Sequence, residues 1–133
     1  ASRLTDVPGS SAYFLGGAVT YANAAKISLA GVSPETLARH GAVSEEVARE
    51  MAAGARRLHG AAAGLGVTGI AGPGGGTPEK PVGTVHVALD VAEGPVRHER
   101  LVLPGDRSMV RRWTTSAALA MIRGWLVERG GAE

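Results

Sequence analysis

Two β-prone segments lie close together in the second half of the chain, at residues 84–91 and 96–103. Because only a short turn separates them, we expect them to pair as antiparallel strands. A Pro-Gly-Asp turn at residues 104–106 then leads into a long final helix. The expected apolar stripe of this helix consists of Val110, Trp113, Ala117, Met121 and Trp125. The chain therefore requires a sheet that is covered by at least one helical layer.

Helical patterns fill most of the first half of the chain. Residues 1–7 match the end of a helix, and residues 22–30 are helix-like. The Ser-Pro pair at residues 33–34 is typical of an N-cap and a first helical residue, which predicts a short helix over residues 34–39. Ser44 is the expected cap of the next helix. The buried face of that helix should contain Val47, Met51, Ala55 and Leu58.

Two further segments have the composition of strands. Residues 17–21 are short and β-prone, and residues 65–70 are typical of a buried strand. The order is then helix, strand, several helices, three strands and a last helix. This order predicts an α/β fold, a three-layer α/β/α sandwich with a mixed β-sheet, in one domain over residues 1–133.

The composition excludes several classes of function. The chain has no cysteine, so it forms neither disulfides nor thiolate metal sites, and an intracellular, cytoplasmic location fits this. The net charge is only +2, from 14 basic and 12 acidic residues, and aromatic side chains are few, so we expect no nucleic-acid partner. No apolar run approaches the roughly 20 residues of a membrane span, so we expect no membrane partner.

A loop rich in glycine and proline runs from Gly72 to about Val82, directly after a predicted strand. It lacks the Gly-Lys-Ser/Thr end of a phosphate-binding P-loop, and it does not open a helix as a dinucleotide-binding turn does. One interpretation is a long surface loop. The other is the wall of an active site, in which backbone N–H groups, such as those of Gly72, Gly74 and Gly75, contact an anion.

Four residues near the start of the chain are candidates for chemistry: Ser10, Ser11, Tyr21 and Lys26. A serine attacks an amide only when a base takes its proton, and none of the 4 histidines has an obvious carboxylate partner in a loop. A lysine can be that base if burial or nearby positive charge lowers its pKa. The alternative is a serine that caps a turn and a lysine with a structural role.

Arg107 follows Gly105-Asp106 at the expected start of the final helix. A guanidinium beside the N–H groups of a helix N-terminus is a good phosphate site. Asp106 is otherwise an N-cap and Arg107 a surface residue. Both interpretations remain open at this point.

Six segments occur in an order that resembles the C-terminal domain of the CinA family over essentially the whole chain. They are Leu4-Thr-Asp-Val-Pro-Gly-Ser-Ser11, Tyr21-Ala-Asn-Ala-Ala-Lys26, His40-Gly-Ala-Val-Ser-Glu45, Thr68-Gly-Ile-Ala-Gly-Pro-Gly-Gly-Gly76, Glu79-Lys-Pro-Val-Gly-Thr84 and Gly105-Asp-Arg107. Together they are far more specific than any one alone. The fold that the resemblance implies, an α/β/α sandwich with a mixed sheet, agrees with the order of predicted elements.

The resemblance implies a nicotinamide-nucleotide amidase, which hydrolyses the carboxamide of nicotinamide mononucleotide to give nicotinic acid mononucleotide and ammonia. Ser11 matches the family's nucleophile, Lys26 its base and Tyr21 the tyrosine beside that dyad. Thr68 and Arg107 match family positions near the substrate, where Ser10 and the glycine loop are also expected. No metal and no cofactor are expected.

Family members carry an Ala-Glu-Ser-Cys-Thr-Gly-Gly segment just before the point where these 133 residues begin, and it contributes a strand and a turn to the site. We therefore expect this domain to lack its N-terminal strand and turn. The resemblance further implies a homo-oligomer, and in some members an N-terminal pyrophosphatase domain. An alternative function is a non-catalytic nucleotide-binding or oligomerisation module of a larger CinA-type protein.

Overall fold

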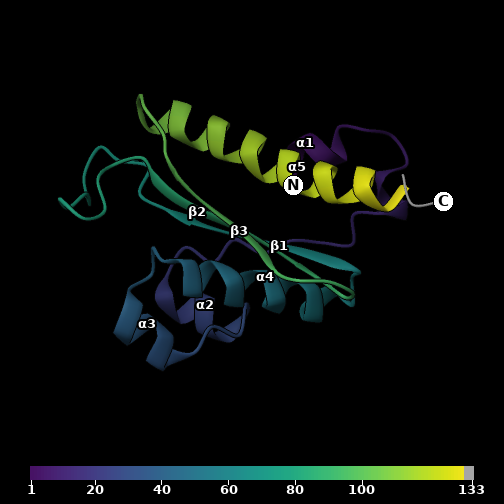
Figure 1. Cartoon of the computed structure of the whole chain (residues 1–133), viewed down its shortest axis with the longest axis horizontal. Helices are drawn as coiled ribbons and strands as arrows, with labels where there is room; N and C mark the ends of the chain where they lie inside the picture. Colours follow the sequence, from purple (N-terminus) through teal and green to yellow (C-terminus); the bar gives the residue numbers. More distant parts are fainter. Residues whose placement is uncertain (131–133) are drawn as a thin grey trace.

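The computed structural model describes residues 1–130, which form three layers (Figure 1). In chain order the elements are α1 (Ser2–Thr5), η1 (Ser10–Ala12), α2 (Asn23–Ser28), α3 (Pro34–His40), α4 (Glu45–His59), β1 (Ala63–Gly69), β2 (Thr84–Val91), β3 (Arg97–Val102) and α5 (Arg107–Gly130). The helices α1 and α5 cover one face of the sheet, and α2, α3 and α4 lie on the other (Figure 1). The predicted α/β/α sandwich is confirmed.

The sheet has the strand order β1-β2-β3, and both pairings are antiparallel. The predicted hairpin of β2 and β3 is confirmed. The expected mixed character is corrected for the residues that the structure describes, because residues 17–21 form coil and pair with no strand. Val19 in that coil is 86% exposed. A β-prone segment becomes a strand only where it finds a partner and a half-buried face.

The central strand β2 is buried along its whole length because helices cover both of its faces. On the α5 side, Val85 and Val87 pack with Val110 and Ala118. On the α4 side, Ala88 packs with alanines of that helix. Residues of even number in β2, His86 among them, therefore face α4.

Small residues let α4 approach β1 very closely. A Cβ added at Gly66 would lie 2.2 Å from the Ala48 carbonyl oxygen. The buried residues of α4 are accordingly Val47, Ala48, Ala52 and Gly54. The predicted face is confirmed at Val47, and Met51 packs beside it, but Leu58 is exposed and does not belong to it. Small residues replace large ones where the two backbones come this close.

The helix α5 lies along the opposite face of the sheet and begins directly after the predicted turn at residues 104–106. Val110 and Trp125 of the predicted stripe are buried, and Ala118 is buried where Ala117 was expected. Trp113 is 55% exposed and does not belong to the stripe. Its neighbour Thr114 is half-buried, and the Thr114 hydroxyl donates to the Val110 carbonyl oxygen at 2.7 Å. Within residues 1–130, no helix is both long and apolar enough to cross a membrane.

Candidate active site

Arg107 joins three segments that are far apart in the sequence. From the first residue of α5, its Nη1 donates to the Gly72 carbonyl oxygen at 3.1 Å, and its Nη2 donates to the Tyr21 hydroxyl at 3.2 Å. Tyr21 is 81% exposed, so it lies at the surface of this cluster. Three residues that the sequence singled out are thus brought together: one from the coil before α2, one from the glycine loop and one from α5.

The glycine loop is held at both ends, and this keeps its middle at the surface. Gly72 is buried with a φ of 84°, and a Cβ there would lie 2.6 Å from Val82 Cγ1, so only glycine fits. At the other end, Lys80 Nζ donates to the His40 carbonyl oxygen at 2.9 Å. Gly74 and Gly75 between these anchors are exposed, so their backbone N–H groups are open to a ligand.

Lys26 is buried in α2, which begins shortly after Tyr21. Only 7% of the residue is exposed, and its Nζ donates to the Thr20 carbonyl oxygen at 2.7 Å. Burial lowers the pKa of this amine below its usual value of 10.5, because desolvation disfavours the charged form. Within residues 1–130 it forms no ion pair. Lys26 therefore has the environment of a lysine that can act as a base.

The two candidate serines lie elsewhere. Ser10 is buried, whereas Ser11 is exposed, and both belong to the short turn η1. This turn packs against α1, on the α5 side of the sheet, while α2 lies on the other side (Figure 1). Within residues 1–130, no hydrogen bond joins Ser11 to Lys26. One copy of the chain therefore does not assemble the predicted dyad.

Thr68 forms no side-chain hydrogen bond with Tyr21, Gly72 or Arg107 within residues 1–130. Its hydroxyl donates to the Ala42 carbonyl oxygen at 2.7 Å, and the residue is buried. It thus fastens the connection between α3 and α4 to the strand β1. Its register partner on β2 is His86, which faces the same helical layer.

A second polar site, which the sequence analysis did not identify, opens on the α4 side of the sheet. It is a cavity of about 370 Å³. The residues that line it are His40, Ser44, Glu45, Glu46, Glu79, Lys80, His86 and Arg100. The sequence holds one signal for this site, because side chains alternate between the two faces of a strand. When β2 and β3 pair, His86 and Arg100 lie opposite each other. Within residues 1–130, no cluster of three or more His, Asp or Glu side chains is arranged to hold a metal.

Comparison with known proteins identifies the relatives of this chain. The family model described as the CinA C-terminal domain matches residues 1–126. The chain belongs to the CinA C-terminal domain family. A CinA-like protein of Citrifermentans bemidjiense is 56% identical over 129 residues, which are 97% of this chain and 31% of that protein. A putative competence-damage inducible protein of Moorella thermoacetica is 51% identical, over 92% of this chain and 29% of that protein.

Solved structures of the CinA family share the fold. The competence/damage inducible protein CihA of Agrobacterium tumefaciens is 43% identical with a TM-score of 0.86, over 92% of this chain and 75% of that one. The competence damage-inducible protein A of Klebsiella pneumoniae is 35% identical with a TM-score of 0.89, over 95% and 78%. The chain thus spans most of these structures but less than a third of the relatives above.

Proposed function

We propose that this CinA domain is an amidohydrolase that converts nicotinamide mononucleotide to nicotinic acid mononucleotide and ammonia in the cytoplasm. The observation that carries the proposal is Lys26, a buried amine with a lowered pKa at the position of the family's base. In its neutral form such an amine can take a proton from a serine hydroxyl, and no metal is needed for that step.

The proposed reaction has two stages. Neutral Lys26 removes the proton of the Ser11 hydroxyl, and the Ser11 oxygen attacks the amide carbon. Backbone N–H groups stabilise the oxyanion, which is typically worth about 3–4 kcal/mol for one donor. Protonated Lys26 then gives its proton to the leaving ammonia, directly or through Tyr21, and water hydrolyses the acyl-enzyme on Ser11.

Because Ser11 and Lys26 of one chain lie in opposite layers, we propose that the dyad forms between two copies in a homo-oligomer. The coil that links them supports this, because it exposes Tyr13, Leu15, Val19 and Tyr21. Exposed apolar side chains in one continuous stretch are typical of an interface. In such an assembly, Ser11 of one copy would meet Lys26 of the other.

Mixing two inactive variants tests the shared dyad. Ser11→Ala and Lys26→Met should each lose ammonia release, and refolding them together should restore it. If copies associate at random as dimers, half of the dimers are mixed and each has one intact site, so activity should reach about a quarter of the wild-type value. Variants that stay inactive together, while the wild type is active, would contradict the shared dyad.

The phosphate of the substrate needs its own site. Arg107 and the exposed N–H groups of Gly74 and Gly75 are the groups that we assign to it, since a guanidinium and an arc of backbone donors suit a dianion. Measuring ammonia release from the nucleotide tests the reaction as a whole. Nucleotide binding without ammonia release would favour the alternative of a non-catalytic module.

A further inference from the structure

A groove of about 500 Å³ lies where α1 meets α5. The residues that line it are Arg3 of α1 and Met109, Arg112, Trp113, Thr115 and Ser116 of α5. Met109, Arg112, Trp113 and Ser116 follow the i, i+3, i+4 and i+7 spacing of one helix face. Arg3 Nη1 donates to Ser116 Oγ at 3.0 Å and so joins the two helices here. The proposed reaction uses none of these residues.

The charge of this groove is positive and is not neutralised by the chain itself. No carboxylate lines it, in contrast to the cavity on the α4 side. Within residues 1–130, the Arg112 side chain has no ion pair or hydrogen bond, and Arg3 donates only to Ser116. Glu128 is the only carboxylate of α5, and Arg97 pairs with it. Unpaired guanidinium groups attract a negatively charged partner.

The apolar part of the groove is formed by Trp113 and Met109. Trp113 is 55% exposed, whereas Trp125, the other tryptophan of the chain, is buried in the core. Tryptophan and arginine are the residues that most often dominate binding energy, and methionine is enriched at interfaces. An exposed indole between two unpaired arginines therefore indicates a partner that carries apolar side chains as well as negative charge.

An acidic peptide fits the groove better than a nucleic-acid strand or a lipid surface. Single strands bind where several aromatic side chains stack successive bases, and this groove offers Trp113 alone among the described residues. A lipid surface contacts a continuous apolar helix face, whereas here arginines stand on both helices that form the groove. The hydroxyls of Thr115 and Ser116 can bind the polar backbone of a peptide.

We propose that this groove is a docking site for an acidic peptide segment of another protein. Arg3 and Arg112 pair with carboxylates of the segment, and Trp113 packs against an apolar side chain that lies between those carboxylates. The docking does not depend on amidase activity, because the residues assigned to that reaction, Arg107 among them, do not line the groove.

The fluorescence of Trp113 tests this docking directly. In the variant Trp125→Phe, Trp113 is the one remaining tryptophan and reports only on the groove. The probe is the acetylated peptide Asp-Leu-Asp-Glu-Leu-Asp, and its uncharged match is Asn-Leu-Asn-Gln-Leu-Asn. The acidic peptide should shift the Trp113 emission to shorter wavelength in a saturable way, and added salt should raise its Kd. The uncharged peptide should bind at least about tenfold more weakly, because it lacks the charged contacts.

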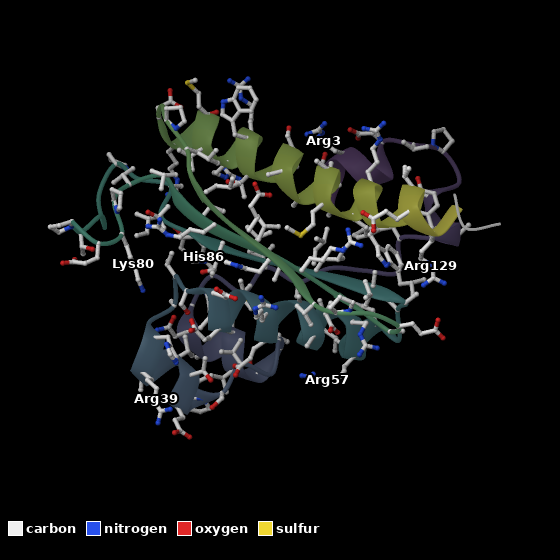
Figure 2. All side chains as sticks on the ribbon, viewed as in Figure 1. Arg3, Arg39, Arg57, Lys80, His86 and Arg129 are labelled. Atoms are coloured by element: carbon white, nitrogen blue, oxygen red, sulfur yellow. The ribbon has the colours of Figure 1, made fainter. Side chains whose placement is uncertain are left out.

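Calorimetric titration of further variants identifies the residues that bind. Arg3→Met and Arg112→Met should each raise the Kd for the acidic peptide at least about threefold, and Trp113→Ala about tenfold. Arg57→Met is the matched control, because it removes the same charge from α4. Figure 2 shows Arg3 beside α5 and Arg57 beside α4, on the other side of the sheet. This control should leave the Kd within about 1.5-fold.

Three results would overturn the proposal. The first is a Trp113 emission that does not saturate with the acidic peptide. The second is a loss of affinity in Arg57→Met as large as the loss in Arg112→Met, because binding would then follow only the net charge. The third is tighter binding of single-stranded DNA or of phosphatidylglycerol vesicles than of the peptide, because the partner would then be of another class.

Discussion

At Arg107, one guanidinium connects the glycine loop, the coil before α2 and the start of α5. Sequence patterns identified Tyr21, Gly72 and Arg107 separately, and only the fold shows that they meet. They meet because the long Arg107 side chain donates one hydrogen bond to the Gly72 carbonyl oxygen and another to the Tyr21 hydroxyl. The Thr68 hydroxyl holds the connection between α3 and α4 to the sheet, and its place near the substrate stays a prediction.

Arg107→Ala should raise the KM for nicotinamide mononucleotide at least about tenfold, the effect of losing roughly 1.4 kcal/mol of binding. The unphosphorylated riboside should be a poor substrate of the parent and should lose little more in the variant. Steady-state kinetics on the two substrates separates the phosphate contact from damage to the fold. Equal losses on both would assign Arg107 a structural role.

Lys26 predicts the pH dependence of the reaction. The base must be neutral, so kcat/KM should rise with pH as Lys26 loses its proton, with an apparent pKa below the 10.5 of an ordinary lysine. A pH–rate profile between about pH 6 and pH 10 measures this limb. A rate that is flat across the range, or that falls as pH rises, would contradict a lysine base.

The variant Lys26→Met separates the role of Lys26 as a base from its effect on the stability of the fold. Burial lowers the folded-state pKa of Lys26, so the unfolded chain binds the extra proton and the native state loses stability as pH falls below the unfolded value of about 10.5. Lys26→Met should therefore abolish ammonia release. It should also remove the proton-linked loss of stability, so its free energy of unfolding should fall less than that of the wild type between pH 10 and pH 7.

Among the elements, the sequence predicted hairpins and caps well because short-range chemistry determines them. Ser33 accepts from Glu35 N and Thr36 N, and Ser44 accepts from Val47 N, as expected of N-caps. Leu58 as a member of the buried face of α4 and the strand at residues 17–21 were wrong, because both depend on packing partners. When a helix packs through alanine and glycine, a search for large apolar residues does not find its buried face.

Gly66→Ala tests this close packing of α4 on β1. The new methyl group would lie 2.2 Å from the Ala48 carbonyl oxygen, so helix and strand must separate. We expect a loss of about 1–3 kcal/mol in the free energy of unfolding, measured by chemical denaturation. Gly124→Ala in α5 is the matched control, because no atom lies near the added Cβ, and it should be neutral or stabilising. Equal stability of the two variants would contradict the close approach.

In the whole molecule, the two helical layers on opposite faces of the sheet keep Ser11 and Lys26 of one chain apart. The sequence places Ser11 and Lys26 close together along the chain, but the coil between them crosses from the α5 layer to the α2 layer (Figure 1). A lysine base requires burial or nearby positive charge, and the structure shows that Lys26 is buried. Sequence reasoning had no means to predict the separation, because no local pattern tells which face of a sheet a coil will reach.

The central claim is that Ser11 of this domain attacks the carboxamide of nicotinamide mononucleotide. Ammonia release and formation of nicotinic acid mononucleotide, followed together for the wild type and Ser11→Ala, test it most directly. We predict equal amounts of the two products from the wild type, and a rate at least about a thousandfold lower for the correctly folded variant. Ammonia release by Ser11→Ala at the wild-type rate, or none from the wild type, would contradict the claim.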